Sequence, residues 1–356
     1  MGARHLTLLM LLALAAGCGS GSSTGASQGL EVEPDLTTLR SSGNNSNPSG
    51  NPIGLLDLGL KRAQDLLHSG DCLVEYFNPA GQLQQQYREE LISDGVSQFS
   101  LKVIESLIPM PTDWDQRKRI REGFAFRYGS FEIRNEDLAD QNFRCFSADQ
   151  TRVIAGQTCD QYSIVPKSGV GSRYEIWVDP QTGLALAAER YDALGVLRHA
   201  RSYESLSLTP DLSQAVWFQG NHNEVSLDLT QPLEIQVGLP VLQPTLLPAG
   251  FDLERAYRLT ERTDLWVKLV YTNGIEPLFL LQRPAPPSKP KNGPRSGKAD
   301  YSSGTPERPN VDERLHVLAL DGVTGIHTNQ PEGTFEAVGI VDEQELVDML
   351  ISALPN

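Results

Sequence analysis

The stretch from residue 151 to residue 208 constrains the fold of this chain more than any other. Within it, SRYEIWVD alternates Tyr174, Ile176 and Val178 with residues of the opposite face, the period of two expected for a half-buried strand. Pro and Gly in PQTG (180–183) mark a tight turn. Short strands joined by such turns predict an antiparallel meander with one packed and one solvated face.

A helical pattern comes before these strands. In residues 53–68 apolar side chains recur at helical spacing, and Gly70 follows as the expected C-cap. CLVEYF, the turn NPAG and QLQQQYREELISDG then predict a β-hairpin, and RYGSFEI (127–133) predicts another strand. An early helix followed by a meander favours a sheet that curves around helical segments.

A second module starts near residue 241. The pair Asn273–Gly274, between LWVKLVYT and IEPLFLLQ, is a strong hairpin signal. RLHVLALDG, VTGIHTN and GTFEAVGIV predict further strands. Asp342 and Glu345 have the spacing of a capping box at the start of a closing helix. This helix is expected to face the sheet with Leu346, Leu350, Ile351 and Leu354.

The first fifty residues have the pattern of an exported, tethered protein. MGARH followed by LTLLMLLALAAG is too short for a membrane span of about 20 apolar residues, but it is typical of a signal peptide, expected here as residues 1–17. Small residues lead directly to Cys18, as in the bacterial lipobox, which predicts a lipid on Cys18 after cleavage. An ordinary signal peptide with an unmodified Cys18 is the alternative. Residues 18–52, rich in Gly, Ser and Asn, are expected to form a flexible tether.

Length and charge narrow the class of protein. Beyond residue 52 the chain is long enough for two domains, expected at 53–212 and 241–356 with a linker at 213–240. Residues 209–240 carry few strand signals and are expected either to link the domains or to extend the sheet. Within the second domain, seven prolines predict that residues 283–314 are a disordered insertion. The net charge of −15 argues against a nucleic-acid partner, because binding to phosphates needs clustered Lys and Arg.

The remaining cysteines and the histidines show no catalytic or metal-binding pattern. In an oxidising compartment we expect a disulfide between Cys145 and Cys159; a bridge from Cys72 and three reduced thiols are the alternatives. The six histidines lack metal-ligand spacing, and no nucleophile, phosphate-loop or cofactor motif occurs. The sequence therefore predicts a binding protein with no cofactor rather than an enzyme.

Both modules resemble the MucB/RseB family. The first matches the family's N-terminal pattern at Gly156, Pro166, Tyr174, Trp177, Asp179, Thr182–Gly183–Leu184 and Asp192–Gly195. The second matches through LPAGFDL (247–253), KLVYTNGIEPLFLL (268–281) and the segment GVTGIHT…FEAVGIVDEQELVDML. Lys268 stands where the family has a histidine. The resemblance covers about residues 53–356 apart from the insertion.

This resemblance implies an α+β fold: a LolA-like half-barrel, in which an antiparallel sheet curves over helices, followed by a smaller α+β domain. Its apolar concave side is where an acyl chain would be buried, at about 0.8 kcal/mol per CH₂. The candidates for lining that cavity are Ile164, Tyr174, Ile176 and Val178. Family members are periplasmic and shield the periplasmic part of a membrane anti-sigma factor from proteolysis until lipid or lipoprotein signals displace them.

The predicted function is therefore that of a cell-envelope binding protein, anchored through Cys18 on the periplasmic side. It would regulate a sigma-factor response to envelope stress by binding an anti-sigma factor and sensing lipid or lipoprotein. The absence of Asp directly after Cys18 favours the outer membrane. A lipid or lipoprotein carrier that uses the same cavity is one alternative, and a structural envelope lipoprotein is the other.

Overall fold

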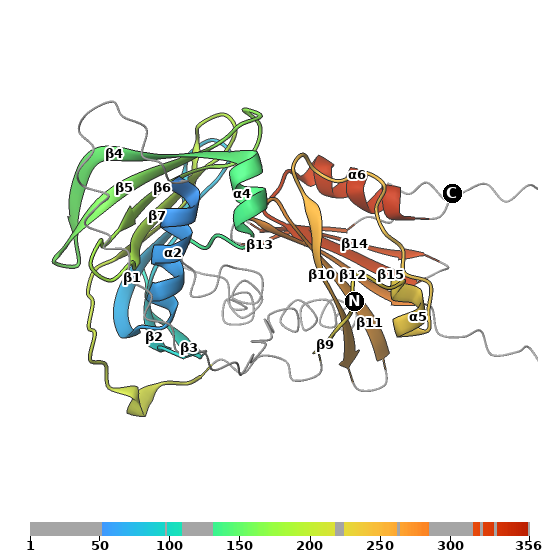
Figure 1. Ribbon diagram of the computed structural model, residues 1–356, viewed down its shortest axis with the longest axis horizontal. Helices are drawn as coiled ribbons and strands as arrows, with labels where there is room; N and C mark the ends of the chain where they lie inside the picture. The colour runs from blue at the N-terminus through green and yellow to red at the C-terminus, as the bar shows by residue number, and fades with distance from the viewer. Residues whose placement is uncertain are drawn as a thin grey trace, which may run out of the picture.

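A computed structural model describes residues 52–96, 98–108, 131–217, 224–261, 264–284, 316–320, 323–330 and 333–354. They form two antiparallel sheets, seen on opposite sides of the molecule in Figure 1. The predicted signal peptide, Cys18 and the predicted tether up to residue 51 lie outside the described residues. So does the predicted insertion at 283–314 from residue 285 on, whereas its first two residues form the end of a strand, Pro277–Pro284, and are not disordered.

The first sheet has eight strands in the described part of the chain, in the order β3-β2-β1-β8-β7-β6-β5-β4. Its strands are β1 (Leu67–Phe77), β2 (Leu83–Asp94), β3 (Phe99–Ser106), β4 (Phe143–Ile154), β5 (Gln157–Pro166), β6 (Arg173–Val178), β7 (Ala185–Tyr191) and β8 (Leu197–Tyr203). β1 pairs with both β2 and β8 and so joins the first hairpin to the later meander. The predicted open, curved antiparallel sheet is confirmed, and its meander from β4 to β8 follows the alternation of residues 151–208.

Two helices pack on the first sheet. Helix α2 (Pro52–Gln64) crosses it in Figure 1 and places Ile53, Leu56 and Leu60 against side chains of β5 and β6. Helix α4 (Glu136–Asn142), which the sequence analysis did not predict, begins at Asn135, whose side chain accepts a hydrogen bond from the Leu138 amide at 3.0 Å.

Two sequence predictions for this sheet are wrong in detail. The first helix ends at Gln64, and Gly70 lies within β1, where a Cβ atom would be 2.3 Å from the carbonyl oxygen of Ser205. Gly70 is therefore needed for close packing and is not a helix cap. Residues 131–133 form no strand; Phe131 and Ile133 instead bury their side chains in the core. Apolar content alone does not distinguish a strand from a buried loop.

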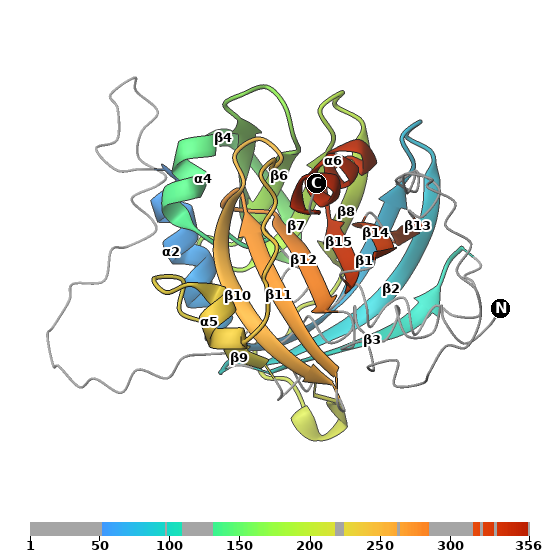
Figure 2. The same cartoon turned by 90° about the vertical axis from the view of Figure 1, so that its right-hand side faces the viewer.

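The second sheet has the order β13-β14-β15-β12-β11-β10-β9 among the described residues. Its strands are β9 (Glu224–Ser226), β10 (Asp252–Glu261), β11 (Asp264–Thr272), β12 (Pro277–Pro284), β13 (His316–Leu320), β14 (Val323–Gln330) and β15 (Gly333–Gly339). Helix α6 (Glu343–Ala353) and the short α5 (Leu233–Val237) pack on one side of it, as Figures 1 and 2 show. The single turn η3 (Leu212–Gln214) lies between the two sheets in the sequence.

The second sheet confirms several sequence predictions and changes two. The hairpin around Asn273–Gly274 forms, and Asp342 and Glu345 make the predicted capping box of α6. Ile351, however, is 40 % exposed, and Met349 is the buried residue of that turn. Both β9 and α5 lie inside residues 213–240, the predicted linker. The second sheet and its helices therefore begin earlier in the sequence than expected.

One glycine fixes how α2 lies on the first sheet. Gly183, in the turn between β6 and β7, has φ +78°, and a Cβ atom there would be 2.2 Å from the carbonyl oxygen of Gly59 in α2. Gly195, in the turn between β7 and β8, has the same φ, but a Cβ atom there would meet nothing within 4 Å. The two positions thus share backbone strain and differ in packing.

We predict that Gly183→Ala destabilises the protein much more than Gly195→Ala. The left-handed conformation costs an alanine about 1–2 kcal/mol at either site, whereas at Gly183 the methyl group must also push α2 away from the sheet. Unfolding in guanidinium chloride, followed by circular dichroism, should show a loss at least about 1 kcal/mol larger for Gly183→Ala, on the scale of overpacked sites. Equal losses for the two variants would contradict this interpretation.

Candidate functional site at the junction of the two sheets

The hairpin tip between β11 and β12 reaches into the first domain. Its Asn273–Gly274 turn is held locally, because the Asn273 side-chain oxygen accepts hydrogen bonds from the amides of Ile275 (3.0 Å) and Glu276 (2.8 Å). The Gly274 carbonyl accepts from the amides of Arg134 (2.9 Å) and Asn135 (3.2 Å) just before α4. A Cβ on Gly274 would lie 2.2 Å from the Ala139 nitrogen, so only glycine allows this approach.

Ile275 is the apolar end of this contact. Its side chain is fully buried, and it belongs to the hydrophobic cluster of the first sheet rather than to that of the second. Around it the cluster includes Phe131, Ile133 and Tyr174. The second domain therefore contributes one side chain to the core of the first.

Glu276 is the polar end of the same contact, with 2 % of its surface exposed. The Tyr174 hydroxyl, from β6, donates a short hydrogen bond to its Oε1, and the Asn273 side-chain amide donates to its Oε2 at 3.2 Å. Burial, together with the neighbouring carboxylate, raises the pKa of Tyr174 well above its usual value. The tyrosine therefore remains a neutral donor, and the buried carboxylate has partners on both oxygens.

Further polar contacts surround the hairpin tip. The Asn142 side-chain amide, at the end of α4, donates to the carbonyl oxygens of Gly250 (2.8 Å) and Asn273 (3.0 Å). The Arg134 Nε lies 3.5 Å from Glu254 Oε2 in β10. Backbone, amide and charged groups from both domains thus meet within a few residues of Ile275.

The four predicted cavity residues belong to one hydrophobic cluster, which reaches this junction at Tyr174. Ile164, Tyr174, Ile176 and Val178 are all buried in the cluster that contains Ile275. Side chains of α2 and Ile275 pack against the same cluster, and the role of the four residues as ligand contacts stays a prediction. No local pattern in the sequence points to Asn142, Ile275 or Glu276, because an Asn-Gly pair predicts a hairpin but not the residues that its tip contacts.

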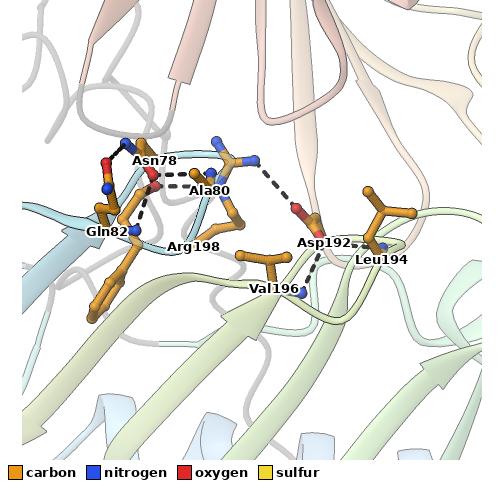
Figure 3. Close-up of polar contacts among 8 residues, drawn as sticks. Asn78, Ala80, Gln82, Asp192, Leu194, Val196 and Arg198 are labelled. Carbon is orange, nitrogen blue, oxygen red and sulfur yellow. Dashed lines mark hydrogen bonds and ion pairs between the residues drawn. The ribbon is translucent and has the colours of Figure 1, made fainter.

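Two turns at this end of the first sheet form a polar rim, drawn in Figure 3. The side-chain oxygen of Asn78 accepts from the amides of Ala80 and Gln82, and that of Asp192 accepts from Leu194 and Val196. Arg198 links them: its Nη1 donates to Asp192 (3.3 Å) and its Nε to the Phe77 carbonyl (3.2 Å). The ladder places Tyr174, Arg190, His199 and Tyr76 in one row next to these turns.

The predicted disulfide between Cys145 and Cys159 is not formed in the structure, where both thiols are free. In the β4–β5 ladder Cys145 lies opposite Ile164, five positions along β5 from Cys159. That offset corresponds to about 16 Å of strand, whereas a disulfide needs Cα atoms within about 7 Å. Burial raises the pKa of both thiols to about 12, so neither is a thiolate at neutral pH.

A second buried polar group lies on β1, β2 and β8. Arg201 Nε is 3.2 Å from Glu89 Oε1, and its Nη2 donates to the Cys72 sulfur at 3.2 Å. Burial raises the pKa of Cys72 to about 12, which keeps this thiol protonated. An ion pair against a neutral thiol is suited to structure, since a nucleophile would need a lowered pKa.

Neither metal binding nor a membrane span has a candidate in the described ranges. Among those residues no group of three or more His, Cys, Asp or Glu is placed to hold a metal ion. Within the same residues no helix has the length and apolar character to cross a membrane. Trp177, one of the residues that match the family pattern, is buried, with the Arg152 guanidinium 5.5 Å from its ring centre.

Comparison with solved structures finds proteins of the family named from the sequence motifs. The complex of Pseudomonas aeruginosa MucA and MucB is 14 % identical, with a TM-score of 0.48, and covers 86 % of this chain and 99 % of that one. The crystal structure of MucB in complex with MucA(peri) is 13 % identical, with a TM-score of 0.46, and the match covers 85 % of this chain and 99 % of that one. A putative outer membrane lipoprotein-sorting protein domain from Vibrio parahaemolyticus is 11 % identical, with a TM-score of 0.20, and the match covers 45 % of this chain and 94 % of that one. No protein-family model and no curated protein matches the sequence.

We predict that Tyr174→Phe destabilises the protein by about 1–3 kcal/mol, because it leaves one oxygen of the buried Glu276 without its donor. Tyr162→Phe is the matched control: Tyr162 is buried in the same cluster, and no described residue forms a hydrogen bond with its hydroxyl. Denaturant unfolding at neutral pH measures both. A Tyr174→Phe loss no larger than that of the control would show that the hydrogen bond contributes nothing.

Proposed function

We propose that this chain is a lipid-anchored regulator in the bacterial cell envelope that binds the periplasmic part of a membrane anti-sigma factor. One observation carries the proposal: residues of the two separate family patterns meet at the junction. Tyr174, from the first pattern, donates to Glu276, from the second. Gly250 and Asn273, also from the second, accept from the same Asn142 side chain. The patterns therefore describe one two-domain unit, which supports a function that needs both domains.

The charge of the chain indicates the kind of partner segment. With a net charge of −15, it attracts basic or amphipathic segments and repels acidic ones. We therefore propose that the partner presents a basic, amphipathic periplasmic segment. In our proposal lipid or lipoprotein acts as the signal that releases it, through differential binding to two arrangements of the domains.

Affinity capture of the full-length anchored protein from detergent-extracted membranes, with identification of both proteins and lipids, tests this function. We expect a membrane anti-sigma factor to co-purify and to be lost when the capture buffer contains high salt, because charge attraction is screened. Bound lipid without a protein partner would support the carrier instead. Neither protein nor lipid would support a structural lipoprotein, and both of these results contradict the regulator.

We predict that the mature protein begins at Cys18 and carries acyl chains there. Whole-protein mass after membrane extraction should give a chain starting at Cys18 with added acyl mass. Cys18→Ser should move the protein to the soluble fraction, because stable anchoring of an otherwise soluble domain depends on its acyl chains. Cys145→Ser, the control for loss of a thiol, should stay in the membrane fraction. A chain that starts elsewhere or lacks acyl mass removes the anchor from this proposal.

A further inference from the structure

The turn that joins β11 to β12 resembles a fatty acid in the chemistry it presents to the first domain. Ile275 supplies hydrocarbon to a cluster of apolar side chains, and Glu276 supplies a carboxylate directly beside it. The Gly274 carbonyl adds an acceptor. On the first-domain side, the donors are the Tyr174 hydroxyl and the amides of Arg134 and Asn135.

We propose that this turn is a displaceable plug. It occupies a site in the first sheet that takes an acyl chain bearing a carboxylate, so that ligand binding and docking of the second domain exclude each other. The inference rests on the proposed function and deepens it, because it names the ligand and the event that a ligand signal would trigger. The site consists of the apolar residues around Ile275 together with the three donors now used by the turn.

The contacts at the plug are arranged to break together. The hydrogen bonds to Gly274 and Glu276 and the bond from Asn142 to Asn273 all belong to one four-residue turn, residues 273–276. Withdrawal of Ile275 moves that backbone and therefore breaks these bonds at the same step. The two domains are then released from each other at this point, which is the coupling that a signalling protein requires.

The energetic balance at the plug favours replacement of the turn by a ligand over permanent docking. Burial of the Glu276 carboxylate has a desolvation cost that its two donors only offset. On release the Glu276 carboxylate regains its hydration and keeps the Asn273 amide within its own turn. The Tyr174 hydroxyl and the amides of Arg134 and Asn135 then become available to the carboxylate of an incoming fatty acid. Hydrocarbon likewise replaces hydrocarbon at the position of Ile275, so every buried group of the plug has a counterpart in the ligand.

Binding of cis-parinaric acid, a fluorescent fatty acid, to the full-length protein tests the plug. Ile275→Ala weakens the docking of the turn in the first domain. The affinity of this variant for cis-parinaric acid should therefore rise by roughly tenfold or more. The matched control is Ile326→Ala, which removes the same atoms from the core under α6, away from the junction. Its affinity should equal that of the unmodified protein. Dodecanoic acid should displace the probe far better than dodecanol, because only the acid offers a carboxylate to Tyr174.

A covalent fastening of the junction provides the opposite test. Arg134→Cys and Glu254→Cys, which lie on opposite domains within ion-pair distance, can be joined by a reducible bis-maleimide. The fastened protein should bind cis-parinaric acid about tenfold more weakly or worse, and cleavage of the linker should restore binding.

Equal affinities of Ile275→Ala and the unmodified protein, equal binding by fastened and cleaved protein, or no binding by any form would each overturn the plug. Capture of the membrane partner is measured separately. If exclusion holds but no anti-sigma factor is captured, the plug stands and the proposed function fails; the reverse pair of results leaves the function and removes the plug.

Discussion

The insertion of Ile275 and Glu276 into the first domain is the contact on which the arrangement of this protein depends. A single turn places an apolar side chain in a foreign core and a buried carboxylate against a tyrosine hydroxyl. Neither group is stable in that position alone: the carboxylate needs its donors, and the turn can approach α4 only because Gly274 has no side chain. Local turn chemistry, close packing and an ion's need for partners therefore act on the same few residues.

The turn enters an apolar cluster that the first sheet forms with its two helices. Helix α2 covers the apolar side of β5 and β6, and its closest approach is allowed by Gly183. Phe131 and Ile133, together with α4, extend the same cluster toward the second domain. The open end of this core is closed by the hairpin tip, with the polar turns at Asn78 and Asp192 along the same end of the sheet.

Much of the fold could be predicted from local patterns. The alternation around Tyr174, the Asn273–Gly274 turn and the Asp342 capping box each depend on neighbouring residues only, and each formed as predicted. Gly70 and Ile351 were misassigned because their environments come from distant segments, Ser205 in one case and solvent in the other. Only the first-domain half of the candidate site could be predicted, because the residues of β5 and β6 share a face of the sheet. The groups that contact them, Ile275 and Glu276, lie about 100 positions away in the sequence.

Lys268 shows how the second sheet differs from the MucB/RseB pattern that it resembles without losing its packing. It stands at the position of a family histidine and is almost fully buried, with its ammonium 2.8 Å from Glu224 Oε1 in β9 and 4.7 Å from the Tyr257 ring centre. A buried ammonium needs such an anion, since an unpaired charge in this position would be strongly destabilising. Glu224 is supplied by the segment expected to be a linker. This ion pair links β9 to β11 across β10. Its two residues are 44 positions apart in the sequence, so no local pattern reveals the contact.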